Sequence, residues 1–188
     1  MAPGTIFTMA GEQYRYLENQ GGGNHMIIWN SRRDSSFNNQ ENRNNQWFDS
    51  LDSTVKAMVQ PVAYSFVTEE TGFETVILDS GRFMPTNLHD FPEVATDETR
   101  VVLGGTPRAF SLSLADVARL SGPGRAFPSS LERLTREGMD NNGWWLRTPA
   151  TDIHGWHISA NNGGLFDGGA RESLWGARGI RPAIIINQ

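Results

Sequence analysis

The first 30 residues alternate short runs of β-forming side chains with glycine-containing turns. Residues 5–9 (TIFTM) are β-rich, residues 13–17 alternate polar and apolar positions, and residues 25–29 form a third apolar run. Alternation with period two places successive side chains on opposite faces of a strand. Turn-forming residues at 10–12 and 21–24 separate the three runs. The pattern predicts an antiparallel meander at the front of the chain.

Residues 30–46 are polar and rich in asparagine, with Phe37 as the main apolar side chain. Asparagine bonds to its own backbone and so competes with regular secondary structure. We therefore expect a solvated surface loop here, with a contribution to ligand binding as the less favoured alternative.

The next segment changes to a helical period. Residues 51–59 carry apolar side chains at helical spacing, with Asp49 or Ser50 as the N-cap. Residues 62–67 and 73–78 then have an extended, strand-like pattern. The middle of the chain should therefore combine a short helix with short extended segments.

Two N-cap signatures predict further short helices. Ser113 is followed three positions later by Asp116, and Ser129 is followed at the same spacing by Glu132. A hydroxyl and a carboxylate at this spacing satisfy the free N–H groups of a helix start reciprocally. We expect both helices to pack on a sheet.

The last 50 residues are rich in tryptophan and glycine. Glycine at this density disfavours helices and is typical of short strands joined by tight turns. Residues 180–186 form an apolar run that predicts a buried closing strand. Trp144 and Trp145, which precede a leucine, are expected in the core. Trp156 and Trp175 lie next to glycines and are equally compatible with a buried or an exposed ring.

These patterns predict an α+β fold of short, twisted antiparallel strands, with two or three short helices and long irregular loops. The chain has 188 residues, which suits a single domain spanning residues 1–188. The 20 glycines and 9 prolines agree with many turns.

Charge and cysteine content exclude several classes of function. The formal net charge is −5 and no run of lysine or arginine occurs, which disfavours a nucleic-acid partner. The apolar runs are too short to span a membrane, and the N-terminus has no pattern typical of a signal peptide. The absence of cysteine excludes disulfides, thiolate metal sites and cysteine nucleophiles.

No familiar catalytic or metal-binding motif is present. His154 and His157, with Asp152 and Asp167 nearby, lack the companion ligands of a zinc site. Calcium-loop spacing, a nucleophile elbow and phosphate-binding glycine motifs are also missing. We therefore expect no cofactor and no catalysis. A hydrolase that uses acidic residues in a cleft stays open as the alternative, because paired carboxylates leave no sequence motif.

Residues 150–178 have the composition of a recognition surface. Aromatic and arginine side chains provide binding energy, while serine, glycine and asparagine provide adaptable hydrogen bonds. The side chains of these types that we expect to bind a ligand are Asp152, His154, Trp156, His157, Ser159, Asn161, Asn162, Phe166, Asp167, Arg171, Ser173 and Trp175.

Motifs near the C-terminus resemble a known family. Residues 144–149 (WWLRTP) and 179–183 (GIRPA) resemble the "WWLRSPG" and "GVRPA" motifs that end a widespread microbial domain. Residues 110–117 (FSLSLADV) resemble the "FLLSLEEV" helix start of that domain. Residues 46–51 (QWFDSL) are a weaker match to its "W-x-x-S-x-L-R" helix. The domain is similar to the formylglycine-generating-enzyme branch of the C-type lectin fold.

Domains with this ending also serve as variable proteins of diversity-generating retroelements. The resemblance implies a C-type lectin-like fold that displays a variable segment, residues 150–179, to a protein or cell-surface ligand. It also implies a location on a virion or cell surface. The formylglycine-generating activity depends on active-site cysteines, which this chain lacks. The residues implied as framework, with the two arginines bonding loop carbonyls or carboxylates, are Trp144, Trp145, Arg147, Arg181 and Pro182.

Overall fold

The computed structural model describes residues 1–64, 67–79, 84–138, 143–171 and 178–188. Within these residues the fold is α+β and consists mostly of sheet, with a few short helices. A four-stranded sheet and a five-stranded sheet contain most of the strands. A two-stranded ribbon of β5 (Val62–Ala63) and β6 (Arg100–Val101) accompanies them.

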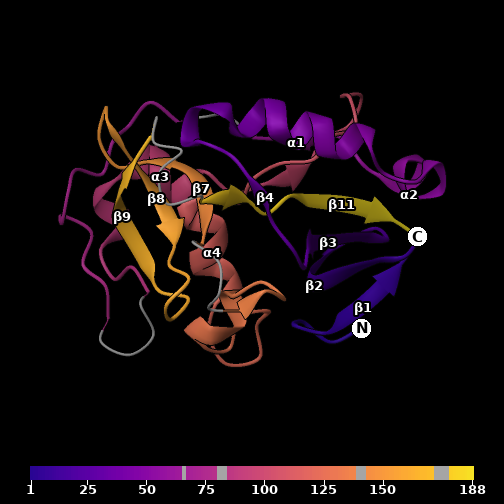
Figure 1. The fold of residues 1–188 in the computed structure, drawn as a ribbon, viewed down its shortest axis with the longest axis horizontal. Helices are drawn as coiled ribbons and strands as arrows, with labels where there is room; N and C mark the ends of the chain where they lie inside the picture. The colour runs from indigo at the N-terminus through magenta and orange to yellow at the C-terminus, as the bar shows by residue number, and fades with distance from the viewer. Residues whose placement is uncertain (65–66, 80–83, 139–142, 172–177) are drawn as a thin grey trace.

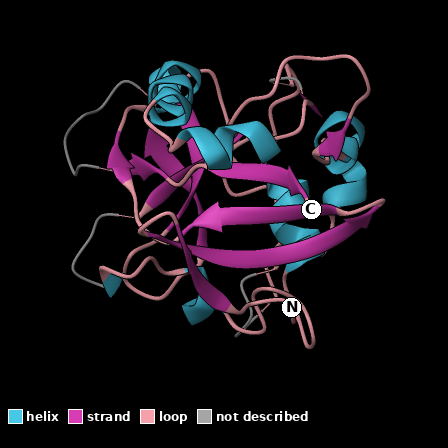
Figure 2. Cartoon of the chain, turned by 90° about the vertical axis from the view of Figure 1, so that its right-hand side faces the viewer, coloured by secondary structure: helices cyan, strands magenta, loops and turns pink. Residues whose placement is uncertain are grey.

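The first sheet contains the predicted meander. β1 (Ile6–Met9), β2 (Glu12–Gly21) and β3 (Asn24–Trp29) pair antiparallel in chain order, which confirms that prediction. β11 (Ala183–Asn187) joins β3, and four of its five residues are buried. The closing strand predicted over residues 180–186 is therefore present, but it begins only at Ala183. Figure 2 shows the strands of this sheet side by side across the molecule.

The second sheet is built largely from the C-terminal segment. In spatial order its strands are β4 (Arg33–Asp34), β10 (Gly179–Ile180), β7 (Trp144–Pro149), β8 (His154–Ile158) and β9 (Leu165–Ala170). The pairings are antiparallel except that of β10 with β7, which is parallel. β9 is the outer strand and lies at one end of the molecule (Figure 1).

The expectation of a loop over residues 30–46 is wrong for most of its length. α1 (Gln40–Asp49) occupies the asparagine-rich segment. Its buried face is partly polar: Gln40 donates to a backbone carbonyl of β7 at 3.1 Å, and Asn44 donates to the Ser111 hydroxyl at 3.0 Å. Because these amides replace apolar side chains on the inner face, the helix leaves no apolar period in the sequence.

The helix expected from Asp49 or Ser50 begins later than predicted, because α1 continues through Asp49. α2 (Ser53–Met58) is capped by Asp52, whose carboxylate accepts a hydrogen bond from the Thr54 N–H at 2.8 Å. In Figure 1 α1 and α2 run along one side of the molecule, next to β11.

The first of the two N-cap predictions is confirmed and the second is not. Ser113 caps α4 (Leu114–Leu120) and forms a complete capping box with Asp116. Ser129 precedes only a 3-10 turn, and its side chain makes no cap hydrogen bond. The short helical turns in the described residues are η1 (Phe37–Asn39), η2 (Leu88–Asp90), α3 (Pro92–Thr96) and η3 (Ser130–Arg133). A transmembrane helix needs about 20 mostly apolar residues, and no helix in the described part of the chain meets this requirement.

The extended segments in the middle of the chain are only partly strands. Of residues 62–67, Val62 and Ala63 form β5, and residues 65–66 lie outside the described residues. Residues 73–78 form no strand but an irregular segment, which ends in a single bridge between Leu78 and Pro85. This segment instead packs beside β9, where it becomes part of the site described below.

Two hydrophobic clusters hold the layers together. The larger lies between the two sheets and α4, and includes Trp144, Leu146 and Trp156. The smaller lies on the other face of the first sheet, where Trp47 of α1 packs with residues of β2 and β11. Trp144 and Trp145 are 1% and 0% exposed, which confirms that they belong to the core.

The two predicted framework arginines are both buried and bonded to loops. Arg181 donates to the Trp29 and Arg133 carbonyls at 2.8 and 2.9 Å and to the Asn30 side chain at 3.0 Å. Burial lowers its pKa to about 9. Arg147 donates to backbone carbonyls and to two buried carboxylates. The sequence prediction of their role is therefore confirmed.

Candidate binding surface on the second sheet

The predicted binding residues divide into three groups. Four are exposed: Asp152, Asn161, Asn162 and Phe166. Three are half-buried: His154, Ser159 and Arg171. Three are buried: Trp156, His157 and Asp167. Ser173 and Trp175 lie outside the described residues.

Trp156 is a core residue, so its prediction as a surface residue is wrong. Its side chain is 1% exposed and belongs to the main hydrophobic cluster. Its indole N–H donates to the Thr71 hydroxyl at 3.0 Å. From the sequence, the neighbouring Gly155 is compatible with an exposed tryptophan ring. A glycine is needed there because a Cβ would lie 2.2 Å from the Phe37 ring.

His157 and Asp167 are also buried, so their expected exposure is wrong. The His157 ring packs between Trp145 and Phe166, with ring centroids 5.5 and 5.3 Å away. Burial, followed by the charge of Arg178, lowers the pKa of His157 to about 3, so the ring is neutral at pH 7. Asp167 accepts a hydrogen bond from the Glu74 N–H at 2.7 Å and so fixes the neighbouring loop.

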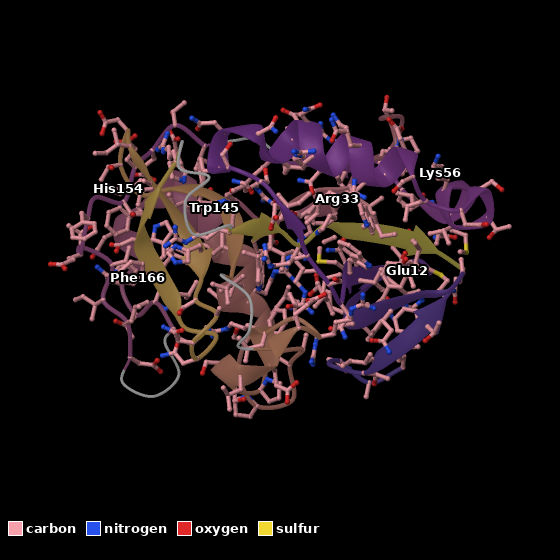
Figure 3. All side chains as sticks on the ribbon, in the orientation of Figure 1. Glu12, Arg33, Lys56, Trp145, His154 and Phe166 are labelled. Carbon is pink, nitrogen blue, oxygen red and sulfur yellow. The ribbon has the colours of Figure 1, made fainter. Side chains whose placement is uncertain are left out.

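An aromatic row crosses one face of the second sheet. Phe37, Trp145, His157 and Phe166 follow one another with ring centroids 5.3 to 5.7 Å apart. The row begins in the core and ends at the outer strand, where Phe166 is 49% exposed. Figure 3 shows Trp145 and Phe166 along this direction. The exposed Phe166 ring therefore packs against a row of buried rings.

Further apolar side chains surround the outer strand. The rings of Phe73 and His154 lie 5.7 Å apart, and atoms of the Phe73 and Phe166 rings both border the position that a Cβ of Gly168 would occupy. Phe73 is 48% exposed and Ile153, next to His154, is 62% exposed. We call Phe73, Ile153, His154 and Phe166 the aromatic patch. Sequence reasoning missed Phe73, because it comes from a loop far away in the chain.

Arg171 borders the patch and fixes its geometry. Its side chain donates to the His154 carbonyl at 3.0 Å, pairs with Glu70 at 3.2 Å, and lies over the Phe37 ring at 5.0 Å. Its backbone N–H bonds to the Ile153 carbonyl at 2.9 Å. A guanidinium held by these contacts loses little further entropy when a ligand binds.

The turn between β8 and β9 exposes two amides. The Ser159 hydroxyl accepts from the Asn161 N–H at 3.3 Å, and the Asn162 side chain accepts from the Gly164 N–H at 2.9 Å. Gly163 is required here, because it has a φ of +68° and a Cβ would lie 1.9 Å from the Ser130 carbonyl oxygen. The turn is thus fixed while its amide groups face solvent.

Two buried carboxylates share one arginine as their partner. Asp97 and Asp116 both bond to Arg147, at 2.7 and 3.1 Å, and Asp116 is completely buried. Desolvation raises the pKa of Asp97, whereas the charge of Arg147 and backbone hydrogen bonds outweigh burial to lower the pKa of Asp116. Among the described residues, no group of three or more histidines and carboxylates is placed to hold a metal ion.

Comparisons of the chain with protein-family models, with curated proteins and with solved structures find no match. The interpretation of the aromatic patch therefore depends on its own residues. Those residues form an exposed apolar surface on a sheet edge, with one fixed cation at its border and two exposed amides in the turn between β8 and β9.

Proposed function

We propose that this chain is a non-catalytic binding protein with a C-type lectin-like scaffold, whose aromatic patch recognises a protein or cell-surface ligand. The observation that carries the proposal is that three large exposed apolar side chains, Phe73, Ile153 and Phe166, lie at the outer strand, where Phe73 packs against His154 and comes near Phe166 at Gly168. Exposed apolar patches bordered by polar groups mark interaction sites more often than single exposed residues do.

The physical state of the patch supports this role. Phe166 extends a row of buried rings, and Arg171 is fixed by four partners, so both residues are ordered before any ligand arrives. Aromatic and arginine side chains at the centre of an interface contribute most of its binding energy. The exposed Asn161 and Asn162 provide adaptable hydrogen bonds at the border.

We propose further that residues 150–179 form a segment that tolerates variation. Support comes from the family resemblance and from the distribution of burial: Asp152, Asn161, Asn162 and Phe166 are exposed, whereas glycines of the same segment are confined by close neighbours. In this view Trp156, His157 and Asp167 are framework. Ser173 and Trp175 stay predicted members of the surface.

A binding screen with matched variants tests the recognition role. The purified chain is applied to arrays of proteins, glycans and intact cells, together with Phe166→Ser and the control Leu103→Ser, which removes a fully exposed leucine outside the patch. Loss of a buried aromatic contact at an interface costs about 2 kcal/mol or more, so we expect at least a ~10-fold loss of affinity for Phe166→Ser alone. Equal binding by both variants, or no selective ligand for the wild type, contradicts the proposal.

The neighbouring DNA tests the diversification separately. A reverse transcriptase gene next to a near-copy of the sequence encoding residues 150–179, with differences confined to adenines, would support it. Differences spread evenly over all four bases would contradict it. In that case the chain would remain a proposed binding protein with a fixed surface.

A further inference from the structure

A cavity lies on the first sheet, on the side covered by α1 and α2. It has a volume of about 330 Å³ and is lined by Glu12, Tyr14, Trp29, Arg33, Trp47 and Asp52, among others. Figure 3 shows Glu12 and Arg33 in the half of the molecule opposite His154 and Phe166. The cavity is therefore separate from the aromatic patch, and small-molecule sites typically have about 300 to 1,000 Å³.

Aromatic rings form one wall of this cavity. Trp47 packs with Trp29 and Tyr14, with ring centroids 5.8 and 6.5 Å apart. The Trp29 indole N–H donates to a carboxylate oxygen of Glu12 at 2.9 Å. This bond holds the carboxylate at the mouth of the cavity and leaves its second oxygen available.

The charged groups of the cavity are not paired with each other. Within the described part of the chain, the Arg33 guanidinium makes no ion pair and no hydrogen bond. The neighbouring Arg32, by contrast, pairs with Asp34. The Asp52 carboxylate accepts hydrogen bonds at the start of α2, from the Thr54 N–H and hydroxyl and from the Val55 N–H, but no cation pairs with it among the described residues. A half-buried arginine and two exposed carboxylate residues thus line one small cavity, and among the described residues no ion pair joins them.

We propose that this cavity binds a small zwitterion of the amino-acid class. The ligand carboxylate would pair with Arg33, and its ammonium would lie between Glu12 and Asp52. A guanidinium suits a carboxylate because it donates two parallel hydrogen bonds. An ammonium next to Trp29 also gains a cation–π attraction. This proposal goes beyond the recognition role of the patch and does not depend on it.

A ligand with a single charge fits less well. An isolated anion would meet the carboxylates of Glu12 and Asp52, and an isolated cation would meet the Arg33 guanidinium. Like charges facing each other at a binding site cost free energy, and this penalty selects against the wrong ligand. A molecule with both charges satisfies all three side chains at once.

Calorimetric titration of the full chain with three probes tests the ligand class. The probes are L-methionine, its methyl ester, which lacks the negative charge, and N-acetyl-L-methionine, which lacks the positive charge. Because each derivative loses a hydrogen bond to a charged group, we expect it to bind at least ~10-fold more weakly than the parent. No binding of L-methionine, or equal binding of either derivative, overturns the proposal.

Two variants test the location. Glu12→Gln keeps an acceptor for the Trp29 indole but removes the charge, and Arg33→Gln removes the cation. Each should weaken L-methionine at least ~10-fold. The controls Glu41→Gln and Arg136→Gln change exposed charges outside the cavity and should bind as the wild type does. Unchanged binding by the two cavity variants would overturn the assignment.

A spectroscopic measurement keeps the location testable if a variant fails to fold. In the ¹H–¹⁵N spectrum of the wild type, the Trp29 indole N–H should shift on addition of L-methionine. The Trp144 indole N–H, which is bonded to the Arg133 carbonyl in the core at 2.9 Å, should not shift. A shift confined to other tryptophans would place the ligand elsewhere and overturn the proposal.

Discussion

The Arg147 guanidinium donates to both carboxylate oxygens of Asp97, at 2.7 and 3.1 Å, where both side chains are almost wholly buried. The same guanidinium reaches Asp116 at 3.1 Å and the Ser111 carbonyl at 2.8 Å. Arg147 projects from β7, and Asp116 lies in α4. One side chain therefore ties the second sheet to the helix and to the loop before β6.

Replacing Arg147 should destabilise the fold strongly. Arg147→Met leaves the buried Asp97 carboxylate without its cation and leaves Asp116, within the described residues, with Arg119 alone. Removal of one partner from a buried ion pair typically costs about 3 to 5 kcal/mol. Urea unfolding measured by tryptophan fluorescence gives the difference in free energy of unfolding.

Two companions make the Arg147 result specific. Arg136→Met breaks an exposed pair with Glu137 and should change stability by about 0.5 kcal/mol or less. Adding Asp97→Asn and Asp116→Asn to Arg147→Met should recover part of the loss, because the uncompensated charges are gone. A similar small effect for Arg147→Met and Arg136→Met would show that the buried pair is not an anchor.

The two N-cap signatures should respond differently to the same substitution. Ser113→Ala removes the hydroxyl that accepts from the Asp116 N–H at 2.9 Å, and loss of such a cap costs about 1 kcal/mol. The Ser113 hydroxyl also donates to the buried Asp97 carbonyl, so the loss should reach about 2 kcal/mol. Ser129→Ala is the matched control and should lie within about 0.5 kcal/mol of the wild type, since Ser129 is exposed and makes no cap bond. Equal losses in chemical unfolding would contradict this difference.

The close approach of Gly155 to Phe37 should make the stability losses of substitutions at these two positions non-additive. Gly155→Ala places a Cβ 2.2 Å from the Phe37 ring and should cost about 1 to 3 kcal/mol through overpacking. Phe37→Leu removes the ring and costs stability by itself, but it also makes room for the Cβ. The double variant should therefore be more stable than the sum of the single losses predicts, by about 0.5 kcal/mol or more. Strict additivity in a double-mutant cycle would mean that the ring moves away without cost.

The parts of the fold that local patterns specify were predictable. The meander, the closing strand β11 and the capping box at Ser113 each depend on neighbouring residues in the chain, and each is present. The framework roles of Arg147 and Arg181 were expected from the resemblance of residues 144–149 and 179–183 to motifs of a microbial domain. In these cases the residues that carry the sequence pattern are the same residues that form the structural element.

The errors arise where distant residues decide the outcome. α1 was missed because Gln40 and Asn44 are buried through partners more than sixty residues away. Gly155, next to Trp156, lacks a side chain because the Phe37 ring occupies the space of a Cβ, and Phe37 lies more than 100 residues earlier in the chain. Phe73 was missed for the same reason. Its ring contacts His154 because an irregular loop packs beside β9, and such a loop has no periodic sequence pattern. No single-sequence signal would have found it.

The buried His157 should make the stability of the fold depend on pH below neutrality. Its pKa is lowered to about 3, first by burial and then by the charge of Arg178, whereas an unfolded histidine titrates near its ordinary value of 6.5. Between these values the unfolded chain binds a proton that the folded chain excludes. The stabilising contribution is therefore complete above about pH 6.5 and is lost as the pH falls toward 3, by up to ~1.4 kcal/mol per pH unit.

Urea unfolding of the wild type at pH 7 and pH 5 should thus show a loss of about 2 kcal/mol from this residue. His157→Phe removes the titrating ring while preserving the aromatic row between Trp145 and Phe166. Between pH 7 and pH 5 this variant should therefore lose about 2 kcal/mol less stability than the wild type does. His89→Gln, at a side chain that is 80% exposed, should retain the wild-type dependence. Equal pH dependence in the wild type and His157→Phe would show that the folded protein accepts a proton at His157, contrary to the burial described here.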